Sequence, residues 1–383
     1  MTDNLKNVVI VGASSAGSTA ARALSKKLPA THRVVLIDAA ESAFWPISSL
    51  RAAVVSGWED KTFVPLEGFF GPADKTRHIV RPSTKVIEVT NSDVLVQTPT
   101  GQEERIGFEY AILATGSAYP VPARPASAKT LEAKAALTKL QADVKAAKHI
   151  LIVGGGEVGV EFAGEVASAY SHAELRKQIT LVSRGTQLVG KDNPAGLSKS
   201  LDQQLQKSGV KVLLGDSVDV PKDTKNGLLG TSQSFTSKNG VEISDVDFVL
   251  VATGTSPVAD LWAHADPDSI VDGQAKVNSK TLRAESTVLT NWFAAGDVAK
   301  LPGSKTHVNA QGGANTAAAN IISLVQGGKG NAKSFAPTNI CVVPLGTSGG
   351  ASNMFGWTIG GFLTSLIKGK TLFVSQFHGA YKP

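Results

Sequence analysis

One run of secondary structure is predicted twice in this sequence, and the repetition constrains the fold more than any other feature. A buried strand, a glycine-rich turn, a helix and a second strand are expected over residues 7–38, and the same order returns over residues 149–183. The two helices are predicted at 18–27 and at about 160–170. An apolar strand ending in Ala-Thr-Gly follows each unit, 102 residues after the first glycine of one turn and 98 after that of the other. One kind of parallel α/β domain has therefore been built twice.

The second turn carries the complete Gly-x-Gly-x-x-Gly pattern at Gly154, Gly156 and Gly159. In that pattern the first glycine makes the tight turn, the second lets the backbone approach a pyrophosphate, and the third lets helix and strand pack closely. The helix N-terminus offers free N–H groups and a partial positive charge to the phosphates. Gly254, in the later Ala-Thr-Gly, is expected to border the same dinucleotide. A glycine turn without a ligand is the alternative, and the matching first unit argues against it.

The first turn departs from the pattern at one place. It runs from Gly12 through Ser14, Ser15 and Ala16 to Gly17, and Ser14 stands where the second glycine is expected. Serine is small, and its hydroxyl can itself donate to a phosphate. We therefore predict that these five residues also bind a dinucleotide.

The ends of the second strands differ between the two units. Asp38 ends the first, 26 residues after Gly12, where a carboxylate accepts from both hydroxyls of an unphosphorylated ribose, as in FAD and NAD(H). The corresponding place in the second unit holds Ser183, followed by Arg184. Because a serine and an arginine can bind a 2′-phosphate that a carboxylate would repel, we predict a preference for NADPH over NADH. The alternatives are a capping aspartate at Asp38 and an exposed arginine unconnected with a ligand.

A third motif, Gly296-Asp297, follows a strand predicted at 288–295. An aspartate at such a position accepts hydrogen bonds from the ribityl hydroxyls of a flavin. The next helix, predicted at 308–325, is rich in Gly and Ala, so it can approach a flat ring closely, and its positive end can stabilise an anionic reduced flavin. A small-residue helix packed on the sheet is the alternative. The first Ala-Thr-Gly completes the expected FAD site: Ala114, Thr115 and Gly116.

Two acidic residues share one face of the second dinucleotide helix. Glu161 and Glu165 are four residues apart, so their side chains lie one turn from each other. Glu161 is a candidate for positioning a nicotinamide or for relaying a proton. A structural pair bonded to nearby backbone is the equally weighted alternative.

The cysteine count excludes one class of redox enzyme. Cys341 is the single cysteine, so neither an intramolecular disulfide nor a redox-active dithiol can form. It lies in an apolar strand-like run and is expected to be an inert core residue. None of the motifs indicates a metal site.

Charge and targeting features favour a soluble protein of the cytoplasm. The net charge is +6 with lysines spread along the chain, which does not favour nucleic-acid binding. No apolar signal segment is present, and Thr2 excludes N-myristoylation. The longest uncharged apolar run, residues 355–367, has 13 residues and is too short to span a bilayer. It is expected to form an amphipathic helix that packs on the FAD domain or on a homodimer partner. The alternative is a helix at a membrane surface that admits a lipid-soluble quinone to the flavin. Peripheral contact with a membrane and association with mitochondria are left open.

The motifs together resemble the pyridine nucleotide-disulfide oxidoreductase superfamily over about residues 7–325. Within it, the sequence is similar to the apoptosis-inducing-factor-like group, which includes ferroptosis suppressor proteins and fungal homologues. The C-terminal match is the most specific, because other members of the superfamily do not share it. The matching stretches are Leu50–Ala52, Lys61–Phe63, Gly154–Glu165, Ala295–Asp297, Lys305 and Lys368–Val374.

The resemblance implies an enzyme in which NAD(P)H gives hydride to FAD and the reduced flavin passes electrons to a quinone or to oxygen. It places Glu161 near the nicotinamide and Lys368 near the flavin, as the expected catalytic residues, and adds Arg51 and Lys305 to the cofactor site. Two departures are noted: Ser14 replaces a glycine, and the lipid-anchoring N-terminus of the ferroptosis branch is missing.

The expected fold is α/β, with two Rossmann-like dinucleotide-binding domains arranged as in glutathione reductase and a small C-terminal α+β domain. The FAD domain takes residues 1–122 and 257–328, the NAD(P)H domain 123–256 and the C-terminal domain 329–383. Two other functions stay open: a flavin-dependent tailoring enzyme for a specific small molecule, and a flavin-bearing redox sensor or nucleic-acid-binding death effector.

Overall fold

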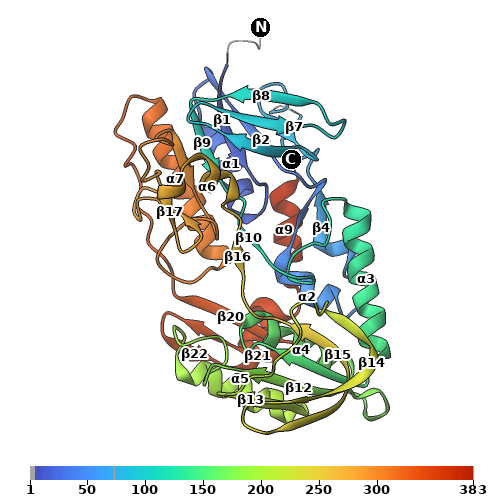
Figure 1. Cartoon of the computed structure of the whole chain (residues 1–383). Helices are drawn as coiled ribbons and strands as arrows, with labels where there is room; N and C mark the ends of the chain where they lie inside the picture. Colours follow the sequence, from blue (N-terminus) through green and yellow to red (C-terminus); the bar gives the residue numbers. More distant parts are fainter. Residues whose placement is uncertain (1–4, 73, 383) are drawn as a thin grey trace.

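Two five-stranded sheets organise the chain, one for each repeated unit (Figure 1). The computed structural model describes residues 5–72 and 74–382. The first sheet has the order β19 (Trp292–Ala294), β9 (Tyr110–Leu113), β1 (Lys6–Val11), β2 (His32–Ile37) and β5 (Ile79–Arg81), with all neighbours parallel. The second has the order β13 (Val210–Leu214), β12 (Gln178–Ser183), β11 (His149–Val153), β15 (Glu242–Val251) and β14 (Gly227–Thr236), in which β14 is antiparallel to β15. The predicted α/β class with two Rossmann-like domains is confirmed.

The central strands are buried on both faces, which explains their continuous runs of Val, Ile and Leu. Val8, Val9 and Ile10 of β1 are fully buried, as are Ile150 and Leu151 of β11. Helices cover both sheets, so each strand contributes side chains to two apolar layers.

Three helices bring the predicted motifs to the sheet edges. They are α1 (Ser15–Lys27), α4 (Glu157–Ala169) and α7 (His307–Val325). The first two begin three residues before the predicted starts, because Ser14 and Gly156 already have the extended dihedrals of an N-cap residue. The predicted strand at 288–295 is shorter and forms β19 alone.

The remaining elements of the two large units form smaller layers. Two three-residue strands, β3 (Ser42–Phe44) and β4 (Phe63–Pro65), pair with each other, and the helix α2 (Pro46–Ala52) packs against α4 of the second unit. A separate meander comprises β6 (Lys85–Val89), β7 (Asp93–Gln97) and β8 (Glu103–Gly107). The two crossings between the units pair with each other as β10 (Ser117–Ala118) and β16 (Ser256–Pro257). The other elements are α3 (Thr130–Ala146), α5 (Ala195–Lys207), α6 (Asp260–Ala265), β17 (Ile270–Val271), β18 (Gln274–Ala275) and short 3-10 turns at Asp60–Thr62, Ala173–Leu175 and Pro267–Ser269.

The C-terminal unit is a three-stranded sheet with short helices. It contains β20 (Ile340–Leu345), β21 (Gly349–Met354), β22 (Trp357–Ile359), α8 (Gly361–Thr364), a π-turn at Ser365–Gly369 and α9 (Val374–Tyr381). In Figure 1 the strands lie against the second unit, whereas α9 returns to the first.

The prediction of one amphipathic helix over 355–367 is wrong. The first part pairs with β21 as strand β22, and only the second part is helical. Five large apolar side chains of this stretch are exposed rather than packed on a core: Phe355, Trp357, Phe362, Leu363 and Leu366. We call these five residues the apolar tip. Within the described part of the chain, no helix is long and apolar enough to cross a bilayer. Residues 1–4, which include Thr2, lie outside the described residues.

Candidate functional site

The two glycine turns have the same geometry. Gly12 and Gly154 have φ angles of +100° and +127°, and a Cβ atom at either would lie 2.5 Å from the carbonyl oxygen of Ala114 or Ala252, respectively. Each strand that ends in Ala-Thr-Gly therefore passes so closely behind its glycine turn that a side chain cannot fit. This contact explains why each glycine turn in the sequence is accompanied by a later strand that ends in Ala-Thr-Gly.

The N-termini of α1 and α4 have the geometry of helix starts that bind phosphate groups. Ser14 and Gly156 have nearly equal φ values of −77° and −76°, and neither helix start is capped by a side chain. A Cβ at Gly156 would meet nothing within 4 Å, whereas one at Gly17 or Gly159 would clash with the turn behind it. Free N–H groups therefore face open space at both helix starts, as a pyrophosphate requires.

Asp38 is fixed at the end of β2 by backbone donors. Its carboxylate accepts hydrogen bonds from the N–H groups of Ala13 (2.6 Å) and Ala40 (2.8 Å). Burial raises the pKa of the Asp38 carboxyl, while these two bonds oppose the shift. The carboxylate thus lies beside the first glycine turn, as a ribose-binding acid does. On the other side of the turn, the Tyr381 hydroxyl donates to the carbonyl oxygen of Ala13 (2.7 Å).

A cavity of about 260 Å³, which we call the flavin cavity, lies between the two units. It brings together ten of the predicted site residues: Ser14, Ser15, Ala16, Ala114, Gly116, Glu161, Gly296, Asp297, Lys305 and Lys368. The side chain of Thr115 points elsewhere, because its hydroxyl donates to the carbonyl oxygen of Val258. The Asp297 carboxylate accepts from Ser117 Oγ (2.8 Å) and Arg124 Nη2 (3.4 Å). Lys305 Nζ donates to the carbonyl oxygen of Ala299, and burial lowers the pKa of its ammonium group.

The flavin cavity also has lining residues that the sequence did not predict, among them the aromatic or titratable side chains of Trp45, Arg124, Glu157 and His307. Trp45 precedes α2 and Arg124 lies in a proline-rich crossing, so neither belongs to a recognisable motif. His307 is the first residue of the small-residue helix, a position that could have suggested it. Burial lowers the pKa of the His307 imidazole to about 4, so the ring is neutral at neutral pH.

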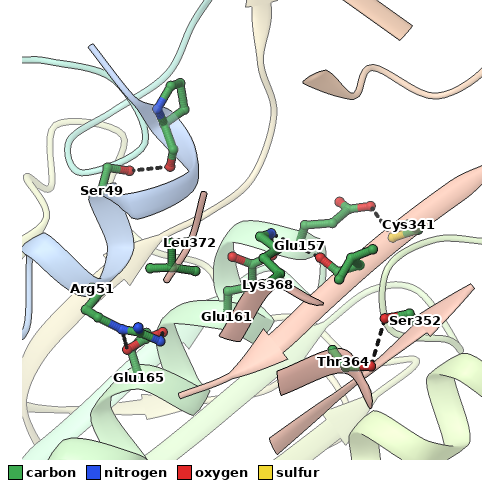
Figure 2. Close-up of polar contacts among 12 residues, drawn as sticks. Ser49, Arg51, Glu157, Glu161, Glu165, Cys341, Ser352, Thr364, Lys368 and Leu372 are labelled. Atoms are coloured by element: carbon green, nitrogen blue, oxygen red, sulfur yellow. Dashed lines mark hydrogen bonds and ion pairs between the residues drawn. The ribbon is translucent and has the colours of Figure 1, made fainter. Parts of the chain in front are cut away.

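The expected catalytic residues Glu161 and Lys368 form a buried ion pair on the cavity wall (Figure 2). Lys368 Nζ donates to Glu161 Oε1 (2.7 Å) and to the carbonyl oxygen of Val342 (3.0 Å). Burial raises the pKa of the Glu161 carboxyl to about 7, and the attraction of Lys368 only partly opposes it. A titratable pair that joins α4 to the C-terminal unit therefore faces the flavin cavity.

Glu165, one turn further along α4, has a different role. Arg51 donates to both of its carboxylate oxygens, from Nε (2.8 Å) and Nη2 (2.7 Å), as Figure 2 shows. The Arg51 side chain is only 1% exposed, its guanidinium lies 4.8 Å from the Trp58 ring, and it is not among the residues that line the cavity. The structure therefore places Arg51 in a buried ion pair with Glu165 and outside the lining of the flavin cavity. The two acidic residues of α4 therefore differ: Glu161 lines the flavin cavity, and Glu165 does not.

A larger cavity of about 1200 Å³, which we call the nucleotide cavity, opens at the carboxyl edge of the second sheet. Gly154 and Arg184 line it, together with four lysines that no motif predicted: Lys139, Lys222, Lys225 and Lys238. Ser183 is buried beneath the glycine turn, where a Cβ on Gly155 would lie 2.6 Å from its Oγ. Gly254 has a φ of +77° and open space beside it. Exposed cations thus gather at this end of the cavity, although Asp216, Asp219 and Asp223 also line it.

Cys341 is a poor nucleophile. Its thiol lies 3.9 Å from Glu157 Oε1, and burial raises its pKa to about 12. The thiolate that redox chemistry requires is therefore scarce at neutral pH. Among residues 5–72 and 74–382, no group of three or more His, Cys, Asp or Glu side chains is arranged to hold a metal ion.

Comparison with known families agrees with this arrangement. The profile described as "Pyridine nucleotide-disulphide oxidoreductase" matches residues 6–315, so the chain belongs to that family. It is a NAD(P)H-dependent flavoprotein oxidoreductase, with FAD and a pyridine nucleotide as cofactors. The predicted family resemblance and the predicted cofactors are confirmed.

Curated relatives match nearly the whole chain. Apoptosis-inducing factor homolog B of Dictyostelium discoideum is 28% identical over 98% of this chain and 97% of that protein. Ferroptosis suppressor protein 1 of Taeniopygia guttata is 29% identical over 98% and 95%. Oxidoreductase ptaL of Pestalotiopsis fici is 29% identical over 97% of both chains.

Solved structures show the same fold at low identity. The NAD-dependent persulfide reductase from A. fulgidus superposes with a TM-score of 0.66 at 17% identity, over 92% of this chain but only 62% of that one. The water-forming NADH oxidase from Lactobacillus brevis gives a TM-score of 0.63 at 19% identity, over 82% of this chain and 68% of that one. The chain thus spans less than two thirds of the first of these structures.

Proposed function

We propose that the protein oxidises NADPH through FAD and reduces a quinone-type acceptor. The observation that carries the proposal is the Glu161–Lys368 pair, buried on the wall of the flavin cavity and one turn from the N-terminus of the nucleotide helix. When bound, the flavin would take a hydride from the nicotinamide and pass two electrons to the acceptor. In balance, NADPH, one proton and a quinone give NADP⁺ and a hydroquinone.

The Glu161–Lys368 pair can take part in the proton transfers that this reaction requires. Reduction of a quinone to a hydroquinone adds two electrons and two protons. The hydride supplies both electrons and the equivalent of one proton, and the solvent supplies the second proton. A carboxyl with a pKa of about 7 both gains and loses a proton readily at neutral pH. Lys368 is held next to it by Val342 O, so the ammonium group stays directed at the carboxylate.

Nucleotide preference rests on the cations of the nucleotide cavity. Arg184 follows the strand end where an acidic residue would exclude a 2′-phosphate, and Lys222, Lys225 and Lys238 line the same space. This arrangement supports NADPH as the donor, and NADH would still fit.

The proposal is tested by reducing the FAD-loaded protein with NADPH and mixing it with menadione, ubiquinone-1 or oxygen in a stopped-flow instrument. We expect both quinones to reoxidise the flavin faster than oxygen does. Lys368→Met should slow reoxidation by the quinones, whereas Lys370→Met is the matched control, because the Lys370 side chain is exposed two residues away. Reoxidation by oxygen at the rate of the quinones, or equal effects of the two substitutions, would contradict the proposal.

A further inference from the structure

A groove of about 910 Å³ lies between α1, α7 and α9, and most of its lining residues belong to neither cavity described so far. In Figure 1 these three helices lie near one another in the upper half of the molecule. The aromatic rings of Trp45, Phe373 and Phe377 line the groove. Its charged lining residues are Arg22, Lys26, Asp74 and Lys382.

The groove and the flavin cavity share a wall. Ser15, Trp45 and His307 line both of them, whereas the nucleotide cavity shares no lining residue with either. The nucleotide cavity and the groove are thus separate spaces, and only the groove borders the flavin cavity directly. A second reactant in the groove would not have to displace the nucleotide.

The shared wall is aromatic, and neighbouring residues hold its Trp45 ring in place. Trp45 stacks on Phe377 with ring centroids 4.9 Å apart and planes 13° from parallel, and its Nε1 donates to the carbonyl oxygen of Leu372 (2.7 Å). The edge of the His307 ring meets the Trp45 ring at 4.8 Å. Aromatic surfaces of this kind bind flat rings by stacking or edge contact.

His307 adds one polar group to this wall. Its Nδ1 lies 2.8 Å from Ser15 Oγ, and in the described part of the chain that is the one hydrogen bond of the imidazole. Nε2 is therefore free to meet a ligand. With Ser15 donating to Nδ1, the neutral ring carries its proton on Nε2 and can donate to a carbonyl oxygen.

The rim of the groove is cationic. Arg22 is held by the carbonyl oxygens of Ala380 (3.3 Å) and Lys382 (2.7 Å) and lies over the Phe69 ring. Among the described residues, neither Lys26 nor Lys382 forms a salt bridge, and Asp74 is the one acid that lines the groove. An anionic substituent on a ligand would therefore be attracted to the rim.

We propose that this groove is the acceptor site, and that the acceptor is a planar quinone carrying an acidic ring substituent. The proposal rests on the proposed function and adds the place and the chemical class of the acceptor. The ring lies against Trp45, a carbonyl oxygen accepts from His307, and the anionic substituent faces Lys26 and Lys382. The redox balance is that given above, and NADPH and the acceptor occupy the protein together.

The test measures binding to the oxidised, FAD-loaded protein without turnover. Isothermal titration is done with 2-hydroxy-1,4-naphthoquinone, which is anionic at neutral pH, and with menadione, its neutral relative. Two exposed charges are worth together about 1 kcal/mol or somewhat more, so Lys26→Gln with Lys382→Gln should weaken the hydroxyquinone about five- to tenfold and leave menadione unchanged. Gln311→Trp, which fills the groove from α7, should abolish binding of both.

Two further measurements separate the outcomes. Gln206→Trp on the exposed face of α5 is the matched control for a surface tryptophan, and saturating NADP⁺ should leave the affinity for the hydroxyquinone unchanged. The groove is wrong as the acceptor site if NADP⁺ competes with the quinone, or if Gln311→Trp binds both quinones normally. In either case a quinone that still reoxidises the flavin leaves the proposed function intact. If no quinone reoxidises the wild-type flavin, the proposed function fails instead.

Discussion

Arg51 and Glu165 form a bidentate ion pair that joins the two dinucleotide-binding units. Arg51 belongs to α2, which comes from the first part of the chain and packs against α4, and Glu165 belongs to α4 itself; their side chains are 1% and 5% exposed. Arg51 Nη1 also reaches the carbonyl oxygen of Lys370 (3.4 Å), two residues beyond Lys368. One guanidinium thus contacts all three parts of the chain that surround the flavin cavity.

Removing one partner of this pair should destabilise the protein strongly. Arg51→Met leaves the Glu165 carboxylate buried without a counter-charge, which costs about 3–5 kcal/mol of unfolding free energy. Denaturant unfolding measures the loss. Arg51→Met combined with Glu165→Leu should recover much of the stability, because no charge is then stranded. The control is Arg105→Met, which removes the exposed pairs with Glu88 and Asp93 and should cost about 1 kcal/mol or less. A loss no larger at Arg51 than at Arg105 would contradict the role of the pair.

Glu161 should make the stability fall as the pH rises from acid to neutral. Its pKa in the folded protein is raised from 4.5 to about 7, so the folded state holds this proton more tightly than the unfolded chain does. The stability that the protonated carboxyl contributes is complete below pH 4.5 and is lost as the pH rises to about 7. Chemical unfolding of the wild type and of Glu161→Gln over this range isolates the contribution. A pH slope that is identical in the two proteins would show that Glu161 does not titrate there.

Arg184→Ala should selectively raise the KM for NADPH. A charge-assisted contact with the 2′-phosphate contributes about 1.5–3 kcal/mol, so a tenfold or larger increase is expected. The KM for NADH should change little, because NADH lacks that phosphate. Steady-state kinetics with both nucleotides makes the comparison, and Lys177→Ala, on the same domain but outside the nucleotide cavity, is the control. Equal effects on the two nucleotides would show that Arg184 does not read the phosphate.

Cys341→Ser should leave NADPH oxidation intact. The thiol is buried, its pKa is raised to about 12, and no second cysteine exists to form a disulfide with it. Electrons therefore leave the flavin without a protein thiol. Turnover with retained flavin is the measurement, and alkylating reagents at neutral pH should react slowly with the native wild type. Loss of turnover in a flavin-loaded Cys341→Ser protein would overturn this expectation.

The apolar tip should bind anionic lipid. Its five side chains are between 49% and 79% exposed, and the sequence from Val298 to Pro383 contains seven lysines and no Asp or Glu. Of these lysines, Lys370 is exposed and lies close to the tip in the sequence, which favours an anionic lipid surface as the partner. Trp357→Ser with Phe362→Ser should abolish co-sedimentation with vesicles that contain phosphatidylserine. If the same variant instead turns a dimer into a monomer, the tip is a subunit interface.

The sequence predicted the parts of the site that are local in the chain. Gly12 and Gly154 were found because a tight turn between a buried strand and a helix leaves a fixed spacing of glycines, and Asp297 because it follows another glycine at a strand end. Trp45 and Arg124 were missed, because tertiary packing alone brings them to the cavity.

Two predictions were changed by long-range contacts. Arg51 was assigned to the cofactor site from its stretch of sequence, yet its carboxylate partner lies 114 residues away on another domain. The apolar stretch around Trp357 has helical spacing, but pairing with the neighbouring strand β21 overrides it. Neither the Glu165 partner of Arg51 nor the β21 partner of the stretch around Trp357 can be predicted from the local sequence pattern.

The hydrogen bond from Tyr381 to Ala13 also bears on the order in which the two domains can fold during synthesis. The two residues are 368 positions apart, so a growing chain exposes its first glycine turn long before the residue that buries it has been made. The second sheet, by contrast, is drawn entirely from residues 149–251 and needs no later strand. We therefore expect the nucleotide domain to mature first on the ribosome, and the flavin to be captured only once synthesis is almost finished.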